Sequence, residues 1–176
     1  FSAIEKECKN VRENVGLLDM TAFAKCRIKG PGAEAFLDKL VANKLPKKIG
    51  RINLCHALNT KGGFHSEFTI MRESETSFYL VSAGAFQRLD HDWILKWMPN
   101  DGSVQFENLT NSNGVLVVAG PKARELMQKV SKDDFSNENF KWLSSKMVDV
   151  GYAPVNAMRV NFVCLLYTSD AADECS

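Results

Sequence analysis

The chain has 176 residues, of which 45% are apolar and 24% charged, a balance typical of globular domains rather than of disordered, fibrous or membrane-embedded chains. Its 22 basic and 21 acidic residues leave a formal net charge of +1, so bulk electrostatics favours neither nucleic acid nor an anionic membrane as a partner. No apolar run is long enough to cross a bilayer, and no charged-then-apolar signal layout opens the chain.

The cysteines and histidines predict no disulfide framework and no metal site. The five cysteines are scattered and form no CxxC pair; they are Cys8, Cys26, Cys55, Cys164 and Cys175. The first three lie among apolar neighbours, where a free thiol behaves as a small hydrophobic side chain. The histidines, His56, His65 and His91, do not have the spacing of metal ligands.

The first elements combine helix and strand. Apolar residues recur at helical spacing from Ile4 to Val15, and Gly16 supplies a stop signal, which predicts an amphipathic helix. Extended structure is expected over 17–29. A second helix is expected over 33–41, after the Gly30-Pro31 turn.

Three strands and a packing helix are predicted next. The strands span 52–58, 64–72 and 78–82, and the polar and glycine-containing turns between them favour hairpins. From Phe86 to Trp97 the apolar residues fall on one helical face, which indicates a helix packed on the core.

The strand-turn-helix pattern then recurs. Strands are expected over 103–109 and 115–119, followed by Gly120-Pro121 and a helix through Val130. Aligning residues 30–40 with 120–130 keeps Gly, Pro, Ala, Lys and the apolar positions in register, which fits either internal duplication or chance reuse of a common junction. The mixture predicts an α+β fold of the β-α-β-β-α-β class, with antiparallel sheets and packed helices.

The strand from Phe64 carries the one acid of chemical interest. A period of two places Phe64, Ser66, Phe68 and Ile70 on one face and His65, Glu67, Thr69 and Met71 on the other. A carboxylate held against apolar side chains loses hydration and becomes better suited to hold a proton near neutrality. Glu67 is therefore the candidate acid or base, unless this face simply meets solvent.

Nucleotide and zinc motifs are absent from the sequence. Gly30-Pro31-Gly32 has no third glycine at the dinucleotide spacing, and proline occupies the turn where the backbone would approach a pyrophosphate. The sequence also contains no Walker A loop, no nucleophile elbow and no Glu-flanked histidine pair. No flavin or nicotinamide site is expected within the chain.

Several segments in fixed order resemble the aminomethyltransferase (glycine-cleavage T-protein) family. They are VRENVGLLDMTAFAK (11–25), GPGAEAFL (30–37), residues 54–67 and AGPKAR (119–124). The resemblance runs to about residue 163. Residues 59–67 and 88–93 are more similar to the folate domain of dimethylglycine and sarcosine dehydrogenases than to the free T-protein.

The resemblance implies a three-part fold built from ferredoxin-like subunits, with tetrahydrofolate bound in a central cavity. Glu67 matches the carboxylate that contacts the reactive folate nitrogens, although the family more often has Asp there. The positions that would line the folate are Phe23, Leu54, Thr69, Met71, Leu80, Ser82 and Phe162. Ser82 replaces a family Asn, which weakens one hydrogen-bond anchor.

The implied function is capture of a one-carbon unit from an oxidised N-methyl amine by tetrahydrofolate. FAD is expected only in a covalently linked flavin domain outside this chain, which would form the iminium. The location would be the cytoplasm in a bacterium and the mitochondrial matrix in a eukaryote. A stand-alone glycine-cleavage aminomethyltransferase and a non-catalytic folate-binding relative remain as alternatives.

The last residues depart from the family. Residues 164–176 resemble a translated sequencing adapter, so we expect an incomplete folate-binding domain over 1–163 followed by a non-native tail. A second pterin carboxylate would be missing, and the fragment by itself is expected to be inactive.

Overall fold

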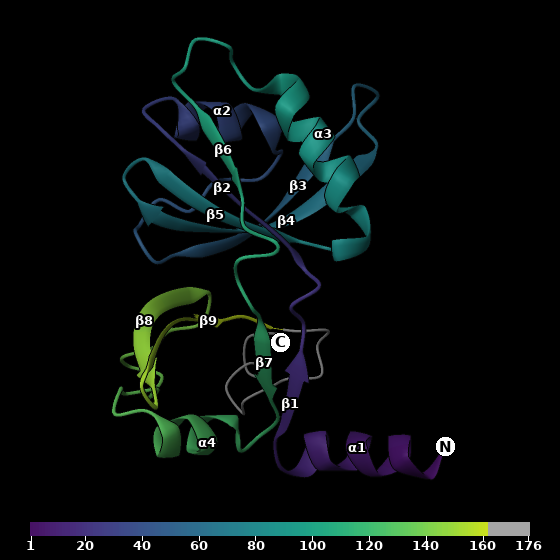
Figure 1. Cartoon of the computed structure of the whole chain (residues 1–176), viewed down its shortest axis with the longest axis vertical. Coiled ribbons are helices and arrows are strands. Elements are labelled where there is room, and N and C mark those ends of the chain that lie inside the picture. The colour runs from purple at the N-terminus through teal and green to yellow at the C-terminus, as the bar shows by residue number, and fades with distance from the viewer. Residues whose placement is uncertain (162–176) are drawn as a thin grey trace. The chain divides into compact units, whose positions relative to one another are not determined.

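The computed structural model describes residues 1–161 (Figure 1). The chain divides into two compact units: one is Thr21–Val115, and the other joins Phe1–Met20 to the residues from Leu116 onward. None of the described helices combines the length and apolar composition needed to span a membrane.

The Thr21–Val115 unit is built on a five-stranded antiparallel sheet in the order β3-β4-β5-β2-β6. Its strands are β2 (Ala24–Lys29), β3 (Ile52–Leu58), β4 (Phe64–Ser74), β5 (Ser77–Ser82) and β6 (Gln105–Asn108). Its helices are α2 (Ala33–Leu40) and α3 (Gln87–Trp97), the latter preceded by the 3-10 turn η1 (Gly84–Phe86). The α+β class with antiparallel sheets is confirmed, and each of the five strands overlaps a range predicted to be extended.

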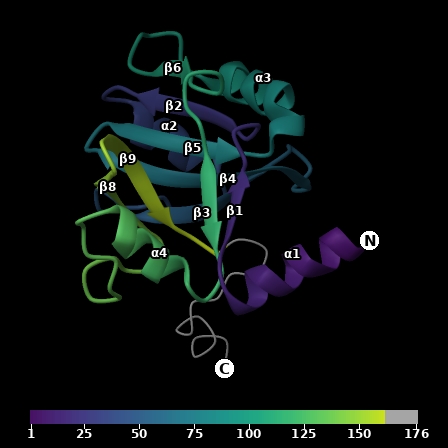
Figure 2. The ribbon, with the colours of Figure 1, turned by 60° about the horizontal axis from the view of Figure 1, so that its bottom comes forward.

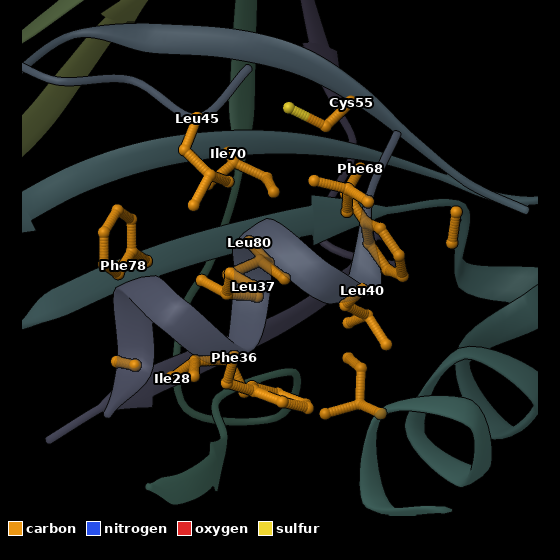
Figure 3. Close-up of a cluster of buried hydrophobic side chains, with 14 of the residues drawn as sticks. Ile28, Phe36, Leu37, Leu40, Leu45, Cys55, Phe68, Ile70, Phe78 and Leu80 are labelled. Atoms are coloured by element: carbon orange, nitrogen blue, oxygen red, sulfur yellow. The ribbon is translucent and has the colours of Figure 1, made fainter. Parts of the chain in front are cut away.

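Both helices pack on one face of this sheet and share its core (Figure 3). In α2, Phe36, Leu37 and Leu40 are at most 7% exposed, because spacings of three and four residues place them on one side of the helix. Ile94 of α3 is fully buried against the same core. The sheet contributes Ile28, Cys55, Phe68, Ile70, Phe78 and Leu80. Each large side chain buried in this way contributes about 1.5–3 kcal/mol, so the core fixes which strand positions face the helices.

The two glycine-proline junctions have the same local geometry. Gly30 and Gly120 have φ values of +124° and +116°, and the carbonyl of each accepts a hydrogen bond of 3.0 Å from the amide three residues later. A Cβ at Gly30 would lie 2.3 Å from the Ser103 carbonyl oxygen, and one at Gly120 would lie 2.5 Å from that of Asn14. Only glycine fits either turn without strain.

Up to residue 161, the second unit contains two strand pairs and two helices (Figure 2). Its elements are α1 (Ser2–Glu13), β1 (Gly16–Asp19), β7 (Leu116–Ala119), α4 (Ala123–Val130), β8 (Ser144–Val150) and β9 (Ala153–Arg159). β1 pairs with β7 and β8 pairs with β9, both antiparallel. Phe135, Phe140 and Val148 form a small buried cluster.

The structure differs from the sequence predictions for the elements in three respects. The extended run predicted over 17–29 is two strands, β1 and β2, which belong to different units. The β8–β9 hairpin was not predicted, because most of its side chains are polar or exposed and only Val148 is buried. The first helix forms as expected, but none of its residues is buried.

Candidate functional site

β4 presents Glu67 on the face of the sheet turned away from α2 and α3. Its neighbours Ser66 and Phe68 are 4% and 1% exposed on the helix side, so the alternation of a strand puts Glu67 on the opposite face. Thr69 and Met71 follow at the same period. The predicted grouping of these three residues on one face is confirmed.

A β-bulge reverses the predicted orientations at the start of β4. The pairing of β3 with β4 shifts register after Phe64, which leaves His65 without an opposite residue. The His65 ring is 4.0 Å from that of Trp93 in α3, whereas the Phe64 ring is 5.5 Å from that of His56. The prediction is therefore wrong for these two residues: His65 faces the helices, and Phe64 lies on the same face as Glu67.

Glu67 contacts a histidine on the neighbouring strand. His56 lies directly opposite Glu67, and its Nε2 is 3.0 Å from Glu67 Oε2. Its Nδ1 is 3.2 Å from Oδ1 of Asn43, which also accepts the His56 backbone N–H at 2.8 Å. Glu67 Oε1 accepts no hydrogen bond from the residues that the structure describes and so is open to a ligand.

Apolar side chains surround this pair on the same face. Leu54 is paired with Thr69, and Leu58 with Phe64, on either side of the His56–Glu67 pair. We call these six residues the Glu67 wall: Leu54, His56, Leu58, Phe64, Glu67 and Thr69. Leu54, Leu58 and Phe64 are 48%, 41% and 63% exposed, so an acid, an imidazole and three accessible apolar side chains form one surface. Such a surface suits a flat ligand that is partly apolar and carries N–H donors.

The Glu67 wall is more open than the sequence predicted. The Glu67 side chain is 53% exposed, because it pairs with β3 on one side but lies beyond the end of β5, whose pairing with β4 starts at Thr69 and Val81. A shallow hollow elsewhere in the described residues is lined by Gly84, Ala85, Gln87, Arg88, His91 and Asp92. Glu67 does not line it, so within the described residues the Glu67 wall is an open surface rather than an enclosed site.

The other predicted site residues are not all on this face. Leu80 is 1% exposed within the helix-side core, and the Ser82 hydroxyl donates a 2.6 Å hydrogen bond to Asp90 of α3, so both face away from Glu67. The pairing of β5 with β4 explains this, because Leu80 lies opposite the core residue Ile70 of β4. Phe23 is partly buried just before β2, and Phe162 lies outside the described residues.

The carboxylate of Asp90 was not predicted from the sequence. It is 3% exposed and accepts 2.6 Å hydrogen bonds from the hydroxyls of Ser66 and Ser82, which ties α3 to β4 and β5. A signal was present in the sequence, because Trp93 and Ile94 follow Asp90 at the spacing of three and four residues that defines one helical face. Both serines are thereby assigned to the packing between helix and sheet.

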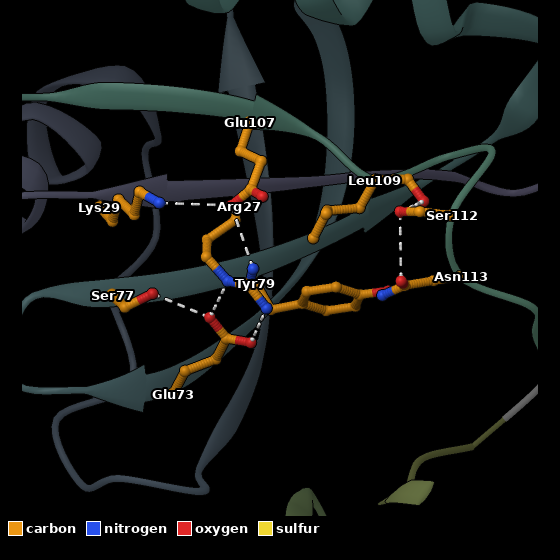
Figure 4. Close-up of polar contacts among 9 residues, drawn as sticks. All are labelled: Arg27, Lys29, Glu73, Ser77, Tyr79, Glu107, Leu109, Ser112 and Asn113. Carbon is orange, nitrogen blue, oxygen red and sulfur yellow. Dashed lines mark hydrogen bonds and ion pairs between the residues drawn. The ribbon is translucent and has the colours of Figure 1, made fainter.

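A second polar network lies at Arg27 of β2 (Figure 4). Its guanidinium donates to Glu73 at 2.6 and 2.9 Å and to Glu107 at 3.1 Å, and Ser77 also donates to Glu73. The hydrogen bond from Arg27 keeps the pKa of Glu107 below its usual range. Burial raises the pKa of Tyr79, which lies beside Arg27. These residues connect β4, β2 and β6, and their hydrogen-bonding groups are paired within the network. The role of the network is therefore structural.

The two buried thiols, Cys26 and Cys55, and the metal-binding residue types of the described part of the chain give no alternative site. Burial, reinforced by Asp90, raises the pKa of Cys26 to about 12, and burial raises that of Cys55 to about 11, so neither is a nucleophile near neutrality. Within residues 1–161, His, Cys, Asp and Glu side chains do not gather in a group that could hold a metal ion.

The antiparallel α+β fold agrees with a family match along nearly the whole chain. Residues 1–166 match the model of the GCVT N-terminal domain, and the chain belongs to this family of folate-binding T-protein domains. Relatives support the same assignment. Mitochondrial dimethylglycine dehydrogenase of Mus musculus is 35% identical over 163 residues, 92% of this chain and 19% of the relative.

Two further proteins are similar to this chain, one in sequence and one in structure. The mitochondrial pyruvate dehydrogenase phosphatase regulatory subunit of Mus musculus is 32% identical, over 91% of this chain and 18% of its own length. The crystal structure of glycine cleavage system aminomethyltransferase T from Bartonella henselae superposes with a TM-score of 0.70 at 21% identity, covering 80% of this chain and 37% of that one. The chain thus spans about a fifth of the length of the mouse relatives.

Proposed function

We propose that the Glu67 wall binds reduced folate and that the domain captures a one-carbon unit from an oxidised N-methyl amine, as in a dimethylglycine dehydrogenase-like enzyme. Family membership supports the folate, and the relative named dimethylglycine dehydrogenase supports the amine. One observation carries the proposal: Glu67 has one carboxylate oxygen fixed by His56 and the other open, on a surface with exposed apolar side chains.

The residues of the wall fit one side of a pterin. Glu67 would accept a hydrogen bond from a folate N–H, while Leu54 and Phe64 would cover the ring and exclude water. Thr69 and Met71 extend the same face along β4. Leu80 and Ser82 belong to the helix side and are not part of this proposal.

Glu67 would act as acceptor of the folate nitrogen's proton as that nitrogen attacks the methylene carbon. Holding the nitrogen against a fixed carboxylate orients its lone pair and removes the entropic cost of a chance encounter. Tetrahydrofolate supplies the nucleophilic nitrogens, and the products are 5,10-methylenetetrahydrofolate and the demethylated amine. The flavin that oxidises the amine would lie in the part of the parent protein outside this chain.

The test is Glu67→Gln in the full-length protein that carries this domain with a flavin domain. We expect the rate of flavin reduction by dimethylglycine or sarcosine to change less than about twofold, and formation of methylenetetrahydrofolate to fall about 100-fold, because general acid–base assistance is of that size. Glu75→Gln, at the exposed turn between β4 and β5, is the matched control. An unchanged yield in the Glu67 variant contradicts the proposal.

A second candidate is a folate-binding domain without a catalytic role. It is supported by the relative that is named as a regulatory subunit. The same experiment separates the two, since folate binding without any methylenetetrahydrofolate in the unsubstituted protein favours this candidate. If the source is eukaryotic, the mitochondrial matrix is the proposed location, because the mouse relatives are named as mitochondrial.

A further inference from the structure

We propose that His56 and Glu67 share a single proton, so that His56 acts as a positioning residue that gives a proton to the Glu67 carboxylate and takes it back. The inference rests on the function proposed above, since it assigns a partner to the same carboxylate. It follows from the atoms that contact the two ring nitrogens of His56.

Asn43 fixes the tautomer of His56. The backbone N–H of His56 can only donate, and it points at Oδ1 of Asn43 at 2.8 Å, so the amide of Asn43 must present its oxygen and not its nitrogen. The same oxygen is 3.2 Å from Nδ1 of His56. An amide oxygen accepts and cannot donate, so this contact is a hydrogen bond only when Nδ1 carries a hydrogen.

A hydrogen on Nδ1 leaves a neutral imidazole with a lone pair at Nε2. That lone pair would meet an oxygen of Glu67 at 3.0 Å, and two acceptors at this distance repel each other unless a proton lies between them. The proton is either on Nε2, giving an imidazolium beside a carboxylate, or on Oε2, giving an imidazole beside a carboxylic acid. Both forms make the observed contact, so the pair holds one proton that can move between the two atoms.

Such a pair suits the proposed reaction, in which protons must move both ways. An iminium ion and tetrahydrofolate give 5,10-methylenetetrahydrofolate, a secondary amine and one proton. Two C–N bonds form to the folate nitrogens, which lose two protons, while the bond from the methylene carbon to the amine breaks and the amine nitrogen keeps the electron pair and takes one proton. A carboxylate linked to an imidazole can accept one proton and return one without waiting for solvent.

The first test is nitrogen-15 NMR of the histidine rings in this chain, recorded without folate. We expect Nδ1 of His56 to have the shift of a protonated nitrogen and Nε2 a shift between the protonated and unprotonated types. In Glu67→Gln the amide of the new side chain donates to Nε2, which should move to the unprotonated type, while His65 and His91 serve as internal references. An unprotonated Nδ1, or an Nε2 shift unaffected by Glu67→Gln, overturns the proposal.

The second test compares two His56 variants in the full-length protein. His56→Gln can still donate one hydrogen bond to Glu67 but cannot store a proton. We expect its affinity for tetrahydrofolate to stay within about twofold and its turnover to methylenetetrahydrofolate to fall about tenfold or more, whereas His56→Ala should lose affinity as well. Normal turnover in His56→Gln contradicts proton sharing.

The outcomes separate this inference from the proposed function. The ring shifts are measured without folate, so a shared proton can be detected even if the wall binds no folate. If Glu67→Gln abolishes methylenetetrahydrofolate but the His56 shifts and the His56→Gln turnover are normal, the proposed function stands and the proton-sharing pair is rejected.

Discussion

Asp90 of α3 and Glu67 of β4 lie on opposite faces of the five-stranded sheet and have opposite surroundings. Asp90 is 3% exposed and its two oxygens each accept a serine hydroxyl, so its hydrogen-bonding capacity is used within the fold. Glu67 is 53% exposed and has an oxygen that the described residues leave open. The two acids therefore differ in how many of their oxygens accept hydrogen bonds within the fold. Asp90 uses both oxygens and stabilises the fold, whereas Glu67 has one oxygen available to a ligand.

Asp90→Ala should destabilise the protein strongly. It leaves the buried Ser66 hydroxyl and the partly buried Ser82 hydroxyl without their acceptor, and we expect a loss of about 2 kcal/mol or more in the free energy of unfolding. Urea denaturation measures this loss. The control is Asp92→Asn, whose side chain is 71% exposed, with an expected change within about 0.5 kcal/mol. Equal stability of the two variants would rule out the structural role of Asp90.

At the scale of elements, the turns are the best predicted features. The Gly30-Pro31 signal places the start of α2 correctly, because a glycine at φ +124° followed by proline is a strong local constraint. The orientation of His65 was not predictable, since a β-bulge is an extra residue that leaves no mark on a polar-apolar pattern. The face on which Leu80 and Ser82 lie was not predictable for a related reason: the resemblance gives an order along the chain but not the face of the strand.

Gly30→Ala should cost more than Gly102→Ala. Both residues have positive φ, +124° and +77°, so both substitutions introduce backbone strain of about 1–2 kcal/mol. At Gly30 the new Cβ would also lie 2.3 Å from the Ser103 oxygen, whereas nothing lies within 4 Å at Gly102. We expect thermal unfolding to show a larger drop in Tm for Gly30→Ala. A similar drop in both variants would show that the close approach relaxes.

At the scale of the whole chain, the buried clusters that the described residues form in the two compact units differ in size. The Thr21–Val115 unit buries a continuous cluster that includes both helices and the sheet, whereas three buried residues form the cluster at Phe135, Phe140 and Val148. The sequence predicted the first core well, because its strands alternate clearly. It missed the β8–β9 hairpin, in which only Val148 is buried and the other apolar side chains are exposed or half-buried.

The difference in core predicts a difference in local stability. Native-state hydrogen exchange should protect the amides of β4 and β5 up to the global free energy of unfolding, while those of β8 and β9 exchange through a smaller opening. The measurement is exchange resolved by residue at low denaturant. Uniform protection across both units would contradict this account.

The central claim is that the Glu67 wall binds reduced folate, and a titration of this chain with tetrahydrofolate, followed by residue-resolved amide shifts, tests it most directly. We expect the shifts to centre on His56, Glu67 and Thr69, to vanish in Glu67→Gln and to persist in the control Glu75→Gln. Shifts that centre elsewhere, or that are the same in Glu67→Gln, would contradict the claim.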